Sequence, residues 1–374
     1  MIVRARTKVN EQMLVECMQN QDMLYDSDMS AGHNLFFLDS GSSALEIFLR
    51  SLEGKKIVGV QAFTCSTVID AIYRAGCKPI FMDIDIDYFT TTLPYVEPVI
   101  GKCDVLIITH LFGIPNPDRI AIGKLCSDNG VVLIDDLCQT FNAKIGGKTV
   151  EELSEAYFYS FFYDKPISCL NGGALYVADR YRDAVLKRLK FVPQQSRKKG
   201  RRRLNALFLL GRLLSPEVYR RDFRVGIVWK WILMRWPLNS DIQRLNRLLT
   251  SKPIVALSLC FDRFFRPEQS ISFLSKNEVR YIKAMMHEFE NTNQILASFY
   301  IERNLPLPLY LENKDIECSL AKRAIVPRKF TTGMELNVEI KLYNWERLAV
   351  DDKSFTNAIY VTRNYVNIPL TRNN

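Results

Sequence analysis

The sequence has few of the side chains that build metal and disulfide sites. Only three of its 374 residues are histidines, and its nine cysteines are scattered and never spaced as Cys-x-x-Cys. A zinc site or a disulfide framework would need such a spacing or an even, clustered set of cysteines. The cysteines therefore indicate small buried residues in a reducing compartment, and we expect no metal.

Long apolar runs are also absent. A membrane-spanning helix needs about 18 uninterrupted apolar residues, and no such stretch occurs. The basic start at 1–8 is not followed by the apolar core of a signal peptide, so we expect a cytoplasmic protein. Hydrophobic residues nevertheless make up 48% of the chain, which is typical of a globular protein rather than a disordered one.

Strand-like and helix-like runs alternate between residues 35 and 178. The continuous apolar runs at 104–109 and 131–134 are typical of strands buried on both faces of a parallel sheet. Further strands are expected at 35–38, 57–60, 79–82, 157–161 and 174–177, and helices at 44–52, 68–75, 180–190 and 272–300. This order predicts an α/β fold with a mostly parallel sheet, whose ligands bind beyond the carboxyl ends of the strands.

The length and the change in composition after about residue 186 predict more than one structural unit. We expect a large α/β domain over 1–186 and a basic, tryptophan-rich insertion over 187–262. A smaller C-terminal α+β domain would then follow over 263–374, because short strands bounded by proline return there together with helical spacing.

Three features at expected strand ends and helix starts suit pyridoxal 5'-phosphate. Ser40-Gly41-Ser42-Ser43 opens a helix, where backbone N–H groups and the helix dipole attract a phosphate. Asp136 ends a buried strand, where a carboxylate can keep a pyridine nitrogen protonated. Lys165 supplies an amine that can form a Schiff base with the aldehyde. Taken alone, such a helix start is more often an ordinary cap, such a strand-end carboxylate a turn residue, and such a lysine a solvated side chain. The prediction of a cofactor site depends on the order of all three along one parallel sheet.

From about 35 to 190 the chain resembles the DegT/DnrJ/EryC1/StrS family of sugar aminotransferases, which have the fold-type-I large domain of pyridoxal-phosphate enzymes. Seven motifs, in register, carry the resemblance: Ser40-Gly41-Ser42-Ser43-Ala44, Gln61-Ala62-Phe63-Thr64, Ala75-Gly76-Cys77-Lys78-Pro79-Ile80-Phe81-Met82-Asp83-Ile84-Asp85, His110-Leu111-Phe112-Gly113, Asp135-Asp136-Leu137-Cys138-Gln139, Ser160-Phe161-Phe162-Tyr163-Asp164-Lys165 and Gly172-Gly173-Ala174.

The resemblance implies a role for each matching residue. Lys165 would be the catalytic residue that bonds to the cofactor and later moves protons, and Asp136 would pair with the ring nitrogen. Gln139 would contact the 3'-oxygen side of the ring. The phosphate would be held by three serines: Ser42, Ser43 and Ser160. Some relatives carry histidine in place of the lysine and act as dehydratases, so the lysine of this chain favours transamination.

The family pattern is broken at three places. Cys65 stands where the family has an aromatic residue stacked on the cofactor ring, and Phe141 stands where it has a histidine. Residues 265–268 do not reproduce the Asn-x-Arg-Met segment through which a neighbouring subunit reaches the phosphate. These differences leave open a degenerate, non-catalytic member of the family.

The function implied by the resemblance is amination of a keto-sugar nucleotide, with glutamate or a similar amino donor, for surface polysaccharide or related glycan synthesis. Relatives form homodimers with the site at the interface, so a homodimer is expected. Two alternatives stay open: a non-catalytic scaffold of the same fold at a membrane complex, and a pyridoxal-phosphate enzyme acting on a non-sugar or lipid-linked substrate.

The positive charge of the protein is concentrated in the insertion. The whole chain carries +9, whereas residues 187–247 contain 17 Lys or Arg against three acidic residues, a net charge of +14. Three of the four tryptophans lie at 229–236, between arginine and aliphatic residues. This mixture favours a helix lying in a membrane interface. A basic loop with an apolar subunit interface is the alternative, and no nucleic-acid-binding module is visible despite the charge.

Membrane association through 197–236 can be tested on vesicles. Each basic residue near an anionic surface contributes about 1 kcal/mol, so we expect the protein to sediment with anionic vesicles at low salt and to be released by high salt. Deleting 197–236 should abolish this sedimentation, measured against neutral vesicles as the control. Undiminished binding of the deletion variant to anionic vesicles would contradict the hypothesis.

Overall fold

The computed structural model describes most of the α/β region and a few segments beyond it. The described residues are 34–55, 57–162, 165, 167, 169, 171–196, 199–200, 203–204, 271–287, 323–327, 346–349 and 353–369. Most of the basic insertion, including 205–262, and most of the expected C-terminal domain lie outside them. The predicted domain boundaries therefore remain predictions.

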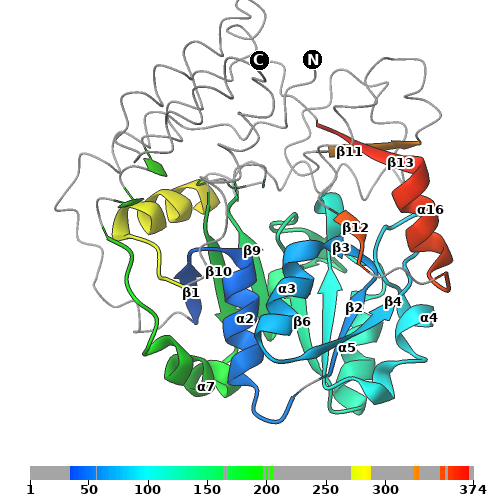
Figure 1. The fold of residues 1–374 in the computed structure, drawn as a ribbon, viewed down its shortest axis with the longest axis horizontal. Coiled ribbons are helices and arrows are strands. Elements are labelled where there is room, and N and C mark those ends of the chain that lie inside the picture. Colours follow the sequence, from blue (N-terminus) through cyan, green and yellow to red (C-terminus); the bar gives the residue numbers. More distant parts are fainter. Residues whose placement is uncertain are drawn as a thin grey trace, which may run out of the picture.

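A seven-stranded mixed sheet forms the centre of the described structure (Figure 1). Its spatial order is β1 (Leu35–Leu38), β10 (Gly173–Val177), β9 (Ala156–Ser160), β6 (Val132–Asp136), β5 (Val105–Thr109), β2 (Ile57–Gln61) and β4 (Lys78–Met82). The five strands from β9 to β4 run parallel to one another. At one edge, β10 runs antiparallel to both of its neighbours, β9 and β1. The prediction of a mostly parallel sheet is confirmed.

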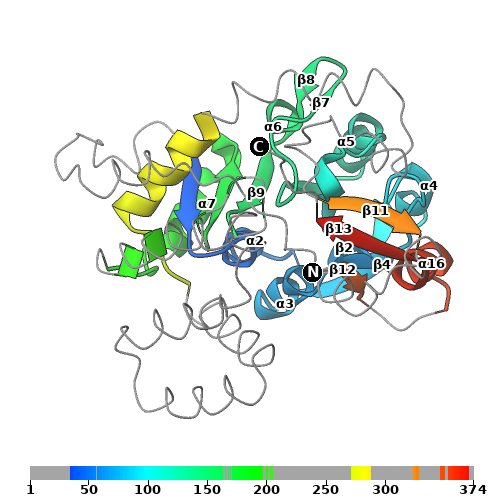
Figure 2. The ribbon, with the colours of Figure 1, turned by 90° about the horizontal axis from the view of Figure 1, so that it is seen from above.

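Helices cover both faces of this sheet, and Figure 2 shows α3 and α5 on opposite sides of the strands. One face packs against α2 (Gly41–Ser51), α3 (Ser66–Arg74) and α7 (Asp179–Leu189). The other face packs against α4 (Leu93–Val96) and α5 (Arg119–Asp128) near β4 and β5. Near β1 and β10 that same face packs against the helix at 276–287. All five residues of β5 are buried, as expected for a strand between two helical layers.

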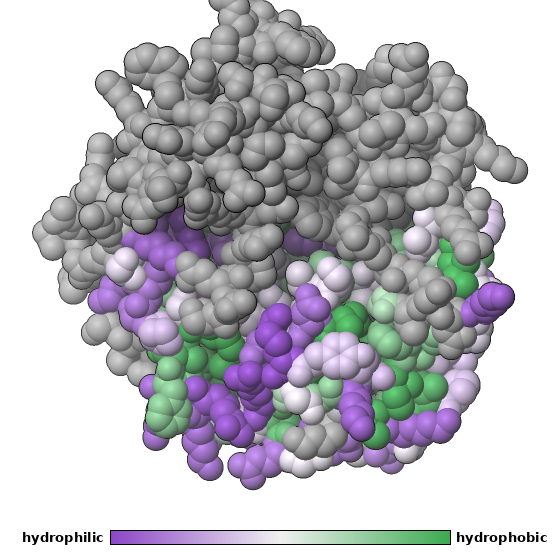
Figure 3. Space-filling model, in the orientation of Figure 1, coloured by the Kyte–Doolittle hydropathy of each residue, from purple (hydrophilic) through white to green (hydrophobic). Residues whose placement is uncertain are grey.

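The surface over α2, α3 and α7 is mixed in character. Hydrophilic side chains run between smaller hydrophobic areas on this face (Figure 3). Among the described residues, no helix is long and apolar enough to cross a membrane.

The C-terminal part of the chain returns to the α/β region at one sheet edge. The carboxylate of Asp83, just after β4, accepts hydrogen bonds from the N–H groups of Asn357 (3.0 Å) and Ala358 (2.8 Å) in the first turn of α16 (Thr356–Asn364). A carboxylate at this place satisfies two N–H groups that have no partner within the helix and complements the helix dipole. Nearby, β12 (Glu346–Leu348) pairs with β3 (Phe63–Cys65), and β11 (Arg323–Pro327) pairs with β13 (Tyr365–Pro369).

Candidate active site

The first turn of α2 lies at the carboxyl ends of the parallel strands. Ser40 is its N-cap, and its hydroxyl accepts a hydrogen bond from the N–H of Ser43 at 3.1 Å. The hydroxyls of Ser43 (2.8 Å) and Ser42 (3.2 Å) both lie within hydrogen-bond distance of the Ser40 hydroxyl. Ser43 is buried in this cap, whereas Ser42 is only half-buried. The predicted phosphate site is therefore a helix start organised by Ser40, to which the sequence motif gave no role of its own.

Two glycines let this helix start approach the sheet. A Cβ atom on Gly173, the first residue of β10, would lie 2.3 Å from the carbonyl carbon of Ser40 and 2.4 Å from the nitrogen of Gly41. A Cβ atom on Gly41 would lie 3.1 Å from Cβ of Ser160 and 3.2 Å from Sγ of Cys138. Ser160, the last residue of β9, is thus brought against the α2 start, as predicted.

Asp136 ends β6 and is buried on the face of the sheet that α2 covers. Successive strand residues point to opposite faces, and Ile134, two residues earlier, packs in the core beneath α2 and α3. The Asp136 carboxylate accepts a hydrogen bond from the N–H of Cys138 at 3.0 Å. Burial raises the pKa of Asp136, and the Cys138 N–H and the nearby Lys165 charge oppose this rise. A cationic partner would offset the desolvation that this buried carboxylate suffers.

Lys165 lies close enough to Asp136 for its charge to affect the carboxylate. Its backbone N–H closes a turn onto the carbonyl of Phe162 at 3.0 Å, and its side chain is half-buried. The ends of that loop are joined to the sheet, because the N–H of Phe161 donates to the carbonyl of Gly172 at 2.8 Å. The sequence predicted an amine and a carboxylate facing one ligand, and the structure brings Lys165 and Asp136 together.

Gln139 lies in the turn that follows β6 and is half-buried. The N–H of the next residue, Thr140, donates to the carbonyl of Leu137 at 3.1 Å and closes this turn. Phe141 points away from the α2 side. It is buried in the core on the opposite face, where its ring packs 5.4 Å from that of Tyr159.

Two thiols border the Lys165–Asp136 pair. Burial, and then the Asp136 carboxylate, raise the pKa of the Cys138 thiol well above its ordinary value, against the charge of Lys165. Cys138 is therefore a neutral thiol. Cys65 and Cys138 are both partly buried and pack against the core beneath α2 and α3. Within the described part of the chain, no three His, Cys, Asp or Glu side chains gather into a metal-binding group.

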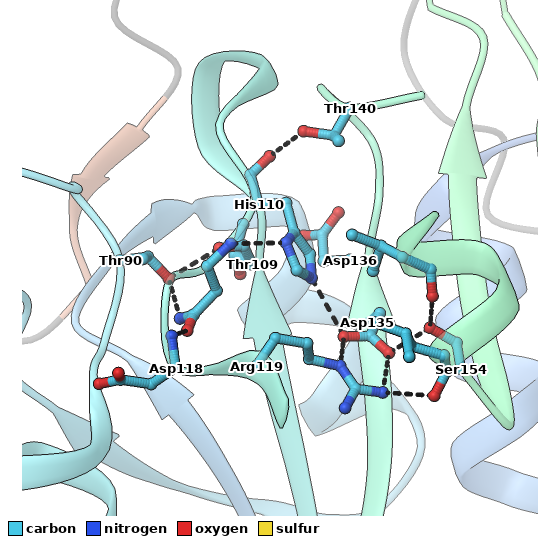
Figure 4. Close-up of polar contacts among 12 residues, drawn as sticks. Thr90, Thr109, His110, Asp118, Arg119, Asp135, Asp136, Thr140 and Ser154 are labelled. Carbon is cyan, nitrogen blue, oxygen red and sulfur yellow. Dashed lines mark hydrogen bonds and ion pairs between the residues drawn. The ribbon is translucent and has the colours of Figure 1, made fainter. Parts of the chain in front are cut away.

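Behind β6, on the other face of the sheet, Asp135 is the centre of a buried ionic network (Figure 4). Arg119 of α5 donates from Nε to Oδ1 (2.6 Å) and from a terminal nitrogen to Oδ2 (2.8 Å), and Ser154 also donates to Oδ2. His110 lies 3.0 Å from Oδ1 through Nε2. Burial would raise the pKa of Asp135, but the hydrogen bond from His110 and the charge of Arg119 lower it below the ordinary value.

The chemistry of this donor set fits pyridoxal phosphate. The start of α2 presents helix N–H groups and serine hydroxyls for a dianionic phosphate. A buried carboxylate and a lysine amine lie at the adjoining strand ends. Cys65, at the end of β3, offers no aromatic face for the ring.

Comparison with known proteins agrees with this geometry. Residues 33–211 match the model of the DegT/DnrJ/EryC1/StrS aminotransferase family. A pleiotropic regulatory protein of Geobacillus stearothermophilus is 34% identical over 144 residues, which are 37% of this chain and 38% of that protein. A UDP-N-acetyl-3-dehydro-alpha-D-glucosamine 3-aminotransferase of Acidithiobacillus ferrooxidans is 30% identical over 156 residues, 40% of this chain and 42% of the relative.

These matches span about two fifths of the length of each relative. A solved structure from Streptococcus pneumoniae covers more of the chain. In its PLP form this protein, provisionally named a sugar aminotransferase, has a TM-score of 0.58 at 13% identity and covers 99% of this chain and 93% of its own. At that identity the likeness establishes the fold, and the predicted fold-type-I architecture is confirmed.

Substitution of Gly173 tests the packing beneath α2. Gly173→Ala should lower the free energy of unfolding by about 2 kcal/mol or more, because the new methyl group meets main-chain atoms that cannot rotate away. Gly101→Ala is the matched control, since a Cβ atom there meets nothing within 4 Å. Denaturant unfolding measures both, and equal stability of the two variants would contradict the prediction.

The ionic network predicts a pH-dependent loss of stability. Asp135→Asn leaves the Arg119 charge buried without its counter-ion, so the free energy of unfolding should fall by about 3 kcal/mol at pH 7. Folding lowers the pKa of Asp135, so its ionised carboxylate stabilises the folded state. This stabilisation is complete above about pH 3.9, the pKa of an aspartate in the unfolded chain, and it is lost as the pH falls through the lower pKa of the folded protein.

The difference between the wild type and Asp135→Asn should therefore narrow below about pH 4 in denaturant unfolding followed at several pH values. Asp128→Asn is the control, because Asp128 pairs with Lys124 on the exposed surface and should show little effect at any pH. A difference that is the same at pH 7 and pH 3 would contradict the role assigned to Asp135.

Proposed function

We propose that the protein is a pyridoxal 5'-phosphate-dependent aminotransferase that aminates a keto-sugar nucleotide. The observation that carries the proposal is the convergence of Lys165, Asp136 and the α2 start at one group of strand ends. Several relatives are named as aminotransferases of nucleotide sugars, among them a UDP-2-acetamido-2-deoxy-3-oxo-D-glucuronate aminotransferase of Pseudomonas aeruginosa at 30% identity over 145 residues. Glutamate or a similar amino acid is the proposed donor, and surface polysaccharide or related glycan synthesis the proposed setting.

Each residue has a defined part in this function. Pyridoxal phosphate supplies an electron sink that lets an amino group pass from donor to acceptor. Lys165 would hold the cofactor through its amine, which would also move protons as a general acid and base. The Asp136 carboxylate would accept a hydrogen bond from the protonated ring nitrogen, and Gln139 would contact the oxygen side of the ring. Ser42, Ser43 and Ser160 would hold the phosphate, Ser43 through the cap that it forms with Ser40.

The homodimer, the cytoplasmic location and the membrane association through 197–236 belong to the same proposal. Most of 197–236 lies outside the described residues. The net charge of +14 over 187–247 supports an anionic partner surface for this segment.

A non-catalytic scaffold is the second candidate. It is favoured by the name of the 34% identical relative, a pleiotropic regulatory protein, and by Cys65 at the place of a stacking aromatic residue. A scaffold of this fold could keep the sheet and the buried network without turning over an amino donor. The two candidate functions therefore differ in whether Lys165 forms a covalent bond with pyridoxal phosphate.

The visible absorbance of the protein purified with pyridoxal phosphate separates them. The wild type should be coloured and should lose its visible band when glutamate is added, because the amino group then passes to the cofactor. Lys165→Ala should lack the band that depends on the lysine, whereas Lys124→Ala, on the exposed surface of α5, should keep it. A wild type that stays colourless with added cofactor would favour the scaffold.

A further inference from the structure

Strand β6 ends in two carboxylates that serve opposite faces of the sheet. Asp136 points toward α2 and Lys165, and Asp135 points toward α5, where Arg119 and Ser154 contact it. Their side chains leave from consecutive residues, so the main chain between them sets the direction of both. Whatever fixes Asp135 therefore also orients Asp136.

His110 is completely buried, and its hydrogen bonds allow one tautomer of the neutral ring. The N–H of Asn116 donates to Nδ1 of His110 at 3.0 Å. Nδ1 is thus an acceptor without a proton, and Nε2 must carry the proton of the neutral ring. Nε2–H points to Oδ1 of Asp135, 3.0 Å away (Figure 4).

The main chain of His110 is joined to the cofactor side of the same strand end. Its N–H donates to the carbonyl of Asp136 at 3.1 Å. Its own carbonyl accepts the hydroxyl of Thr140 at 2.7 Å, at the end of the turn that carries Gln139. His110 therefore contacts the network behind the sheet, the main chain of Asp136 and the turn of Gln139.

We propose that His110 is a positioning residue of the cofactor site, which directs the Asp136 carboxylate at the ring nitrogen through its Nε2–H to Asp135 and its main-chain N–H to Asp136. This inference rests on the proposed function only in naming what Asp136 binds. Among the described residues, the groups that act on Asp136 are Lys165, Cys138 and His110, and the Asp135–Arg119 pair lies on the opposite face of the same strand end.

Loss of the Nε2–H donor has a definite electrostatic consequence. Asp135 would keep Arg119 and Ser154 but would lose one of its donors, so more of its negative charge would act on the neighbouring Asp136. The pKa of Asp136 should then rise. A carboxylate that is ionised less of the time binds a protonated ring nitrogen more weakly.

Two amide substitutions distinguish the hydrogen bond made by Nδ1 of His110 from the one made by Nε2. In His110→Asn the amide oxygen can take the place of Nδ1 and still accept from Asn116, but nothing reaches Asp135. In His110→Gln the amide N–H can take the place of Nε2 and still donate to Asp135, but the N–H of Asn116 loses its acceptor. Each variant loses one hydrogen bond, so their free energies of unfolding should fall by similar amounts.

The first measurement needs no cofactor. The carboxylate resonances of Asp are followed by 13C NMR against pH in the cofactor-free protein, with Asp136→Asn to assign the signal of Asp136. We expect an upward shift of the Asp136 pKa in His110→Asn and a value near that of the wild type in His110→Gln. The second measurement is the dissociation constant of pyridoxal phosphate by equilibrium dialysis, which should rise roughly tenfold in His110→Asn and little in His110→Gln.

The outcomes are distinct. If both variants shift the Asp136 pKa equally, or neither does, His110 has only a structural role and the inference is wrong. If the wild type binds no pyridoxal phosphate, the proposed function fails, while the NMR comparison still decides whether His110 acts on Asp136.

Discussion

The contact between Gly173 and the main chain of Ser40 is the constraint on which the candidate site depends. The helix start can reach the strand ends only because the first residue of β10 has no side chain there. That approach puts Gly41 against Ser160 and Cys138, and so places the N–H groups of a helix beside two strand ends. The antiparallel β1 and β10 at the sheet edge are therefore part of the site, although neither supplies one of its proposed ligands.

The two carboxylates of β6 have different roles: Asp135 stabilises the packing of the sheet, and Asp136 is available to a ligand. Asp135 is neutralised by a bidentate arginine and packed behind the sheet, where its pKa is lowered and its charge stabilises the α5 interface. Asp136 has one N–H from Cys138 as a partner, and burial raises its pKa. Asp135, whose charge is already paired, holds the strand in place. Asp136, whose charge is incompletely compensated, is the carboxylate available to a ligand.

Strand positions, sheet type and the convergence of Lys165 with Asp136 were predictable because they follow from apolar runs and from the rule that strand ends share one edge. The hydrogen bonds within the site were not. The hydroxyls of Ser40 and Ser43 lie 2.8 Å apart in the helix cap, a contact that depends on side-chain rotamers and that the motif alone does not give. Arg119 and Asp135 come from a helix and the strand that follows it, and Asp83 contacts a helix 275 residues further on, so no local pattern encodes either pair.

The strand edge that carries Cys65 is paired with the C-terminal part of the chain. Cys65 ends β3, and in the β3–β12 ladder its partner is Glu346, so main-chain pairing from the C-terminal part of the chain fixes this edge. The α16 start is fixed to the same region by Asp83. Without an aromatic face at 65, retention of a bound ring depends more on charge pairing at Asp136 and on the phosphate cradle of α2. The orientation of Asp136, and hence the network of His110 and Asp135 behind it, then carries a larger share of binding than it would beneath a stacked ring.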